Sequence, residues 1–379
     1  MKIALIAVHF SEYAFRLAQT LANNHDVLLC VNKKNFTNEV SASIQRAPAP
    51  RCRIVWLPDT WLRSPLDFVT GVTTLTGTIR KFKPDIVHCQ EAVRDYLIVA
   101  LQLLPRYPLV LTIHDHVPHT GQDSTVSKRV RFYKSFLRQR ADLVIVHGDQ
   151  IRRDCERLMP WLAGRIVSIP HGPLGGHMSL PRTHWNNGTL LFFGRIEAYK
   201  GLRYLIEAVR LLKKDGVDVK VIIAGTGSDL ACHRQEVITE SSFELLDRYI
   251  DKEEIADLFA RADIAVMPYT DATQSGVAAI ALNYRCPVIA TDVGSLAEMV
   301  RNGVNGVLVP PRNPEALADA IRSVAFDRKK LANMSARAAA LADNDFSWSS
   351  IGLRTQAAYE RVRQRTDDRT AARSYAVNG

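Results

Sequence analysis

Short apolar runs alternate with amphipathic stretches through the first half of the chain. A helix beginning at Ser11 and another from about Asp67 to Phe82 fit a period of 3.6 residues, with Ser11 as the expected N-cap. The runs themselves are apolar without alternation, as in parallel strands that are buried on both faces and covered by helices. The predicted strands are Ile3–Val8, Val27–Val31, Ile54–Leu57, Asp85–Cys89, Leu109–Ile113, Leu143–His147 and Ile166–Ile169.

The pattern is interrupted between His171 and Asn187, where Gly, Pro, His and Asn dominate and predict a linker. The same alternation then restarts. Asp251 and Glu254 have the spacing of a capping box ahead of one of the second set of helices. The predicted strands here are Leu190–Phe193, Val219–Ala224, Phe243–Leu246, Ile264–Met267, Val288–Thr291 and Val307–Val309.

Together these patterns predict an α/β protein with two Rossmann-like, doubly wound domains facing across a cleft. Ligands bind at the carboxyl ends of the strands in such folds. We expect the first domain at residues 1–172 and the second at 186–345. A final helix is expected at 346–365, followed by a polar, disordered tail at 366–379.

Composition narrows the class of protein. No apolar run approaches the roughly 20 residues that cross a bilayer. The six cysteines form no C-x-x-C pair, which indicates a reduced, cytoplasmic protein without a cysteine zinc site. Residues 1–185 hold 24 Lys and Arg against 14 Asp and Glu, whereas residues 186–379 hold 25 of each. The net charge of +10 therefore belongs to the first half, and it favours an anionic partner there, either nucleic acid or lipid.

The strongest candidate site follows the first strand of the second half. Gly194 permits a sharp turn, and Arg195 and Lys200 can neutralise a diphosphate. Farther along, Gln274, Ser275, Gly276 and Val277 open a helix whose first amides can bind an anion. For the first site the alternative is a loop with solvated charges. For the second it is a helix start that Ser275 caps without any ligand.

Histidines gather after the strand that ends at Ile113. His114 and His116 alternate along an extended segment, so we expect hydrogen bonds to the hydroxyl groups of a ligand and no metal site. Surface histidines of a loop are the alternative. Asp115 and His116 here, with His9 and Ser11 after the first strand, are the candidates for the acceptor side.

A basic segment with apolar residues between the charges spans residues 127–140. Its candidate membrane-facing residues are Lys128, Arg129, Arg131, Phe132, Lys134 and Arg138. Such a helix can lie on an anionic lipid surface, and it can equally pack on its own sheet with a solvated basic face. Elsewhere, Gly225–Gly227 lacks the spacing of a dinucleotide-binding loop, and Asp343 and Asp345 lie where helix-capping residues are expected.

Taken together, the chain resembles the GT-B glycosyltransferases, and within them family 4. The resemblance covers nearly the whole chain and is densest from Leu190 to Pro314. The segments that carry it are Phe192–Arg195 with Lys200-Gly201, Ala262–Ile264, Pro287–Gly294, Asn305-Gly306, Lys83–His88, Thr112–Asp115 and Ile169–Gly172.

The resemblance implies that Arg195 and Lys200 bind the donor diphosphate together with the amides of 275–277, with Glu298 also at the donor. It places His114 beside the transferred sugar and implies a final helix that crosses back onto the first domain. The family is retaining and needs no metal or other cofactor. One departure concerns a pair of glutamates, whose positions are held here by Ala272 and Ile280 or, with a shift of one residue, by Asp271 and Ala279.

We therefore expect a retaining hexosyltransferase that moves a sugar from a nucleotide-sugar to a glycan or lipid-linked acceptor in surface polysaccharide or glycolipid synthesis. It would work in the cytoplasm, peripherally on the inner membrane face. The absent glutamates motivate a second hypothesis, a non-catalytic nucleotide-sugar or glycan-binding protein. A sugar-nucleotide epimerase is a third. Nucleic acid is not an expected partner, because the chain has no recognised reader motif or aromatic stacking platform.

Overall fold

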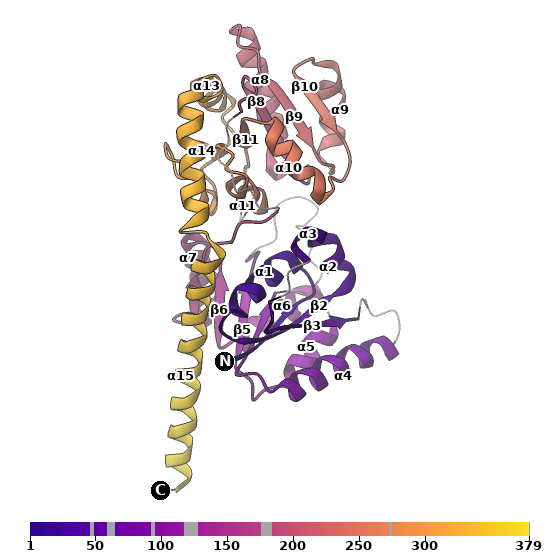
Figure 1. Cartoon of the computed structure of the whole chain (residues 1–379), viewed down its shortest axis with the longest axis vertical. Coiled ribbons are helices and arrows are strands. Elements are labelled where there is room, and N and C mark those ends of the chain that lie inside the picture. Colours follow the sequence, from indigo (N-terminus) through magenta and orange to yellow (C-terminus); the bar gives the residue numbers. More distant parts are fainter. Residues whose placement is uncertain are drawn as a thin grey trace. The chain divides into compact units, whose positions relative to one another are not determined.

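The computed structural model describes residues 1–45, 49–58, 65–91, 95–116, 128–175, 184–272 and 275–378. These residues form two compact units (Figure 1). The first holds the described residues up to Gly172 and those from Trp348 onward, and the second holds those from Pro173 to Ser347. The chain enters the second unit just after Gly172, where Leu174 already packs against an apolar cluster of that unit.

The first unit is built on a parallel sheet of seven strands among the described residues, in the order β3-β2-β1-β4-β5-β6-β7. Neighbouring residues of β1 face opposite sides: Ala4 joins one apolar cluster and Leu5 the other. Both faces are therefore buried, as the unalternating apolar runs predict. The strands are β1 (Lys2–Ala7), β2 (Asp26–Asn32), β3 (Cys52–Leu57), β4 (Ile86–Gln90), β5 (Leu109–Ile113), β6 (Leu143–Val146) and β7 (Ile166–Ser168).

Helices cover the two faces of this sheet (Figure 1). They are α1 (Ser11–Leu21), α2 (Lys33–Glu39), α3 (Ala42–Gln45), α4 (Pro65–Phe82), α5 (Asp95–Gln102), α6 (Lys128–Arg140), α7 (Asp149–Leu158), the 3-10 turn Pro160–Leu162 and α15 (Trp348–Asn378).

The second unit has a parallel sheet of six strands among its described residues, in the order β10-β9-β8-β11-β12-β13. The strands are β8 (Thr189–Phe193), β9 (Lys220–Ala224), β10 (Phe243–Leu246), β11 (Ile264–Met267), β12 (Val288–Thr291) and β13 (Gly306–Val309). The helices are the 3-10 turn Ala198–Lys200, α8 (Leu202–Lys214), α9 (Leu230–Thr239), α10 (Lys252–Arg261), α11 (Gly276–Asn283), α12 (Leu296–Met299), α13 (Pro314–Val324) and α14 (Arg328–Asp343).

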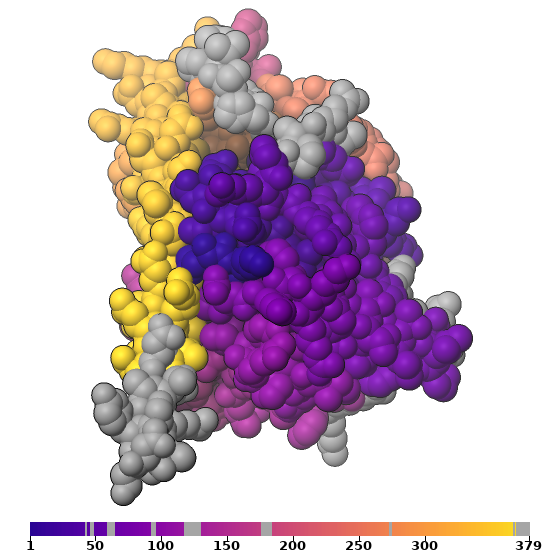
Figure 2. All heavy atoms as spheres, turned by 60° about the horizontal axis from the view of Figure 1, so that its bottom comes forward, coloured from indigo at the N-terminus to yellow at the C-terminus, as the bar shows by residue number. Residues whose placement is uncertain are grey.

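The last helix, α15, belongs to the first unit. Ile351 and Tyr359 are buried in the same apolar cluster as α1. A Cβ added to Gly352 would lie 2.5 Å from Cγ2 of Thr20, so this glycine lets the two helices approach closely. Figure 2 shows α15 against the N-terminal part of the chain. The return of the last helix to the first unit, expected from the resemblance, is confirmed.

Helix ends agree with the sequence in one place and differ from it in two. The capping box of Asp251 and Glu254 is present at the start of α10. Ser11 is not the N-cap of α1: that position is Phe10, at φ 61°, and the Ser11 N–H donates to the Glu39 carboxylate. The expected disordered tail from residue 366 is also wrong, because α15 continues to Asn378.

Candidate functional site

The turn after β8 brings a glycine and a lysine together in the second unit. Gly194 has φ 103°, a backbone conformation that favours glycine. A Cβ at this position would lie 2.9 Å from Nζ of Lys200 and 3.3 Å from Cγ2 of Val277. Three of the predicted donor residues, which come from two separate segments, therefore meet at one point.

Lys200 is a buried cation. Its side chain is 6% exposed, and within the described part of the chain it forms no ion pair. Its Nζ lies 5.4 Å from the ring centroid of Tyr269. Burial, and secondarily the charge of Arg195, lowers the pKa of Lys200 to about 8, although the charge of Glu197 acts in the opposite direction. A buried charge that no ion pair neutralises is costly, so this arrangement favours the binding of an anion.

The start of α11 lies beside this lysine. Ser275 is the N-cap, and its hydroxyl accepts a hydrogen bond from the Ala278 N–H at 3.2 Å. Val277, whose methyl group lies beside Gly194, is in the first turn of the helix. Capping by Ser275 is thus confirmed, and the first amides of α11 lie in the same loop cluster as Lys200. Gln274 lies outside the described residues.

Arg195 and Glu298 are the other two residues predicted at the donor. Arg195 is exposed, at the turn that follows β8, and Glu298 is half-buried on α12. The positions of the two absent glutamates are apolar in the structure as well. Ala272 is buried, and Ile280 packs against the same cluster. No carboxylate stands at either position to hold a ribose or a sugar.

His114 lies in the first unit, at the end of β5. It is 1% exposed, and its Nε2 lies 2.8 Å from Oε1 of Gln90. The ring of Phe10 stacks on it, with centroids 3.7 Å apart and an angle of 15° between the planes. Burial lowers the pKa of His114 well below its usual value, and nearby histidines add to this effect. The ring is therefore neutral, and the Phe10 side chain covers one of its faces.

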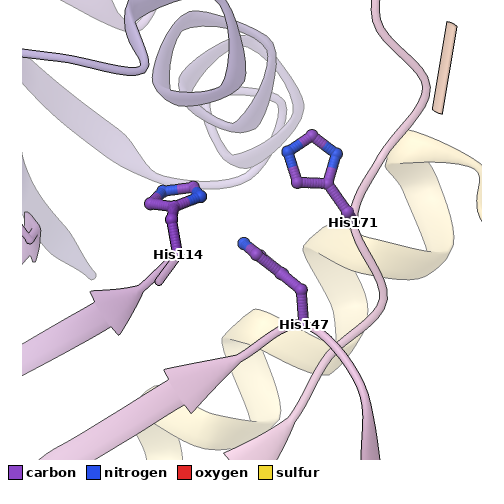
Figure 3. Close-up of side chains that lie close together, drawn as sticks. All are labelled: His114, His147 and His171. Atoms are coloured by element: carbon purple, nitrogen blue, oxygen red, sulfur yellow. The ribbon is translucent and has the colours of Figure 1, made fainter. Parts of the chain in front are cut away.

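Two further histidines lie against His114 and escaped the sequence prediction. His147 follows β6 and His171 follows β7, and both are buried (Figure 3). Burial lowers the pKa of His147 to about 3 and that of His171 to about 4. The sequence contains a signal for them, because His147 ends a predicted strand and His171 comes shortly after the next one. In the structure β5, β6 and β7 are neighbours in the sheet.

The residues predicted for the acceptor side contact different partners in the first unit. His9 Nδ1 lies 3.0 Å from Nδ2 of Asn35, and His116 lies 4.0 Å from the Asp154 carboxylate. The Asp115 carbonyl accepts a hydrogen bond from Arg138. Ser11 Oγ is buried and has no hydrogen-bond partner among the described residues.

The basic helix α6 packs on its own sheet. Leu137 is buried in the core, and Tyr133 packs against it. Arg138 is also buried, with Nε and Nη2 at 2.7 and 2.9 Å from the two oxygens of Glu91, so its expected exposure to a membrane is wrong. Lys134 lies 3.5 Å from the same carboxylate.

Of the residues predicted to face a membrane, Arg131 and Phe132 are exposed. No side-chain position is described for Lys128 and Arg129. Among the described residues no helix is both long enough and apolar enough to span a bilayer.

Comparisons with known proteins match both units. The model described as Glycosyltransferase Family 4 matches residues 11–172, and the one described as Glycosyl transferases group 1 matches residues 187–327. Glycogen synthase of Mycobacterium tuberculosis is 30% identical over 75% of this chain and 70% of its own length.

Solved structures agree with this. Sucrose-phosphate synthase from Thermosynechococcus elongatus superposes with a TM-score of 0.70 at 21% identity, covering 96% of this chain and 99% of that one. Anabaena HepE in complex with UDP-glucose gives 0.67 at 20% identity, covering 96% and 99%.

Two parallel, doubly wound units with a last helix that returns to the first define the GT-B fold of glycosyltransferases. The chain belongs to glycosyltransferase family 4 and is a glycosyltransferase.

Proposed function

We propose that this glycosyltransferase moves a hexose, with retention, from a nucleotide-sugar to a glycan or lipid-linked acceptor. The observation that carries the proposal is Lys200, a buried cation without an ion-pair partner in the described part of the second unit, beside Gly194 and the start of α11. A diphosphate supplies the missing counter-charge, and the glycine leaves room for it. Solved neighbours are described in complex with UDP or UDP-glucose, so UDP is the nucleotide to test first.

In this proposal the protein groups act on the leaving nucleoside diphosphate. Charge develops on it as the anomeric C–O bond breaks, and Lys200, Arg195 and the first amides of α11 stabilise that charge. A donor phosphate oxygen takes the acceptor proton. His114 contacts the transferred sugar after Phe10 moves aside. In this proposal cations and amides neutralise the diphosphate, so the transfer uses no metal or other cofactor.

The acceptor is proposed to be held at an anionic membrane surface in surface polysaccharide or glycolipid synthesis. The basic excess lies in residues 1–185, and α6 presents Arg131 with the exposed ring of Phe132. An exposed aromatic ring beside cations is suited to a lipid interface. The proposed location is the cytoplasmic side of the membrane.

The test combines nucleotide binding with turnover. Millimolar UDP is expected to raise the melting temperature of the purified protein, because a ligand that binds only the folded state stabilises it. Lys200→Ala and Arg195→Ala are each expected to abolish this shift and to lower transfer about 10²–10³-fold. Lys213→Ala, at an exposed lysine of α8, is the matched control and should do neither.

The apolar positions Ala272 and Ile280 favour one rival function, a nucleotide-sugar-binding protein without turnover. That protein would show the UDP shift and its loss in Lys200→Ala, but no sugar would be transferred or hydrolysed with any acceptor preparation. Absence of a shift with UDP, GDP and ADP alike would overturn the donor site itself.

A further inference from the structure

Three histidines point toward one another in the first unit. One ring nitrogen from each of His114, His147 and His171 lies within 4.8 Å of those of the other two (Figure 3). They come from the ends of β5, β6 and β7, three neighbouring strands of one parallel sheet. The sheet holds the carboxyl ends of these strands in place, so the convergence of the three rings does not depend on a surface loop.

Hydrogen bonds determine which nitrogen each of two rings presents. Nδ1 of His147 lies 2.9 Å from the Ile169 carbonyl oxygen, and Nδ1 of His171 lies 2.8 Å from that of Gly172. A carbonyl oxygen only accepts, so Nδ1 carries the proton in both rings and Nε2 keeps a lone pair. Nε2 of His147 is buried and has no hydrogen-bond partner within the described residues.

The third ring is oriented in the same way by a side chain. Nε2 of His114 lies 2.8 Å from Oε1 of Gln90, so it donates and Nδ1 is the acceptor nitrogen. In metal sites, ligating histidines almost always donate their other N–H to a carbonyl, carboxylate or water. All three rings have this second hydrogen bond, and two have it with backbone carbonyls.

We propose that His114, His147 and His171 form a site for one transition-metal ion of the zinc type. Three neutral imidazoles suit Zn²⁺, Co²⁺, Ni²⁺ or Cu²⁺, and they do not suit Mg²⁺ or Ca²⁺. The fourth position is left to a small ligand such as water.

The fit to a metal requires a small closure of the rings. Ligand nitrogens of a tetrahedral site with bonds of about 2.0–2.1 Å lie roughly 3.4 Å apart. From 4.8 Å, the widest pair must close by roughly 1.4 Å, within the reach of side-chain rotation. Ring centroids are already 4.8 to 6.1 Å apart.

Tyr13 is the competing explanation. Its buried ring lies 5.0 to 5.4 Å from all three imidazoles, and a core in which these rings merely pack around it has the same contacts. The two explanations differ in what a metal does to the protein, because packing alone produces no stoichiometric, histidine-dependent metal binding.

The ion has a consequence for transfer, which rests on the proposed function. A metal held by His114 withdraws that ring from the sugar, so Zn²⁺ is expected to inhibit an enzyme that works fully after chelation. The site is then regulatory; its residues belong to the first unit, whereas the proposed diphosphate site at Lys200 belongs to the second.

Cobalt absorption tests the site without any substrate. Chelated protein titrated with Co²⁺ is expected to develop the visible bands of tetrahedral cobalt, saturating at one ion per chain and reversed by Zn²⁺. His147→Gln and His171→Gln should weaken binding about 100-fold or more. His25→Gln, at a histidine of the same unit bonded to Gln356, is the control and should bind normally. Circular dichroism establishes that each variant is folded.

A folded protein with no cobalt bands, or bands that survive in both variants, would overturn the site. Binding that is intact while no sugar is ever transferred would leave the metal site standing and count against the proposed function. Zn²⁺ inhibition that persists unchanged in folded His147→Gln would contradict the regulatory role.

Discussion

Each unit contains a buried cation, and the two cations differ in whether a carboxylate pairs with them. Arg138 in the first unit is 8% exposed and donates two hydrogen bonds to Glu91. Burial alone would lower its pKa, but the hydrogen bonds and charge of Glu91 outweigh that effect and raise it. Lys200 in the second unit is 6% exposed, has no such partner among the described residues, and its pKa falls to about 8.

This difference distinguishes a charge with a structural role, at Arg138, from a charge that a ligand would neutralise, at Lys200. A cation whose counter-charge is built into the fold contributes to stability and stays charged. A cation buried without one lowers stability until a ligand arrives. Substitutions at the two cations and at the start of α11 test this contrast, and we expect the largest effect on stability at the pair of Arg138 and Glu91.

Breaking that internal pair should have the largest effect. Arg138→Met leaves the Glu91 carboxylate buried, with Lys134 as its remaining ion-pair partner among the described residues, and we expect it to lower the free energy of unfolding by about 3–5 kcal/mol. Urea denaturation measures this. The double variant Glu91→Leu/Arg138→Met removes both charges and should recover most of the loss. A single variant within about 1 kcal/mol of the parent on the same assay, the value of an exposed pair, would show that the pair is not structural.

Much of the fold could be predicted from the sequence, because the strands are marked by their apolar runs. The predicted strands Phe243–Leu246, Ile264–Met267 and Val288–Thr291 match the structure to the residue. The order of strands and the return of α15 depend on contacts far apart in sequence, and the return could be predicted only through the resemblance.

The residues of the candidate sites could be predicted only in part, because some of them meet through contacts between distant segments. Gly194 and Lys200 lie on one short loop, so their proximity can be inferred from sequence. The prediction for Arg138 is wrong because its partner Glu91 is 47 residues away, after another strand. His147 and His171 meet His114 only because their strands are neighbours in the sheet, and no single segment of sequence contains that fact.

Removing the unpaired cation should stabilise the protein. A shift of the Lys200 pKa from 10.5 to about 8 corresponds to roughly 3 kcal/mol, so Lys200→Met is expected to raise the free energy of unfolding by up to roughly that amount at pH 7. The variant should also lose the UDP-induced shift in melting temperature.

The pH dependence of that gain has a definite sign. Below pH 8 the lysine is charged in both folded and unfolded chains, and the whole penalty applies. Between pH 8 and 10.5 the folded state binds fewer protons than the unfolded state, so the parent regains stability as the pH rises. The advantage of Lys200→Met should therefore shrink over this range, as urea denaturation at several pH values can measure. A gain that is constant up to pH 10.5 would mean that packing, and not charge, is responsible.

The smallest effect distinguishes a helix start that binds an anion from one that is only capped. Ser275 caps α11 beside Lys200, and Asn313 caps α13 with a hydrogen bond of 2.8 Å from the Ala316 N–H. Ser275→Ala and Asn313→Ala should each cost about 1 kcal/mol of stability, because each leaves one helix amide without its cap. Only Ser275→Ala should also weaken UDP binding, measured by calorimetry, since the frayed turn no longer holds its free amides toward the phosphate. Equal UDP affinity in the two variants would assign Ser275 to capping alone and leave the anion to Lys200 and Arg195.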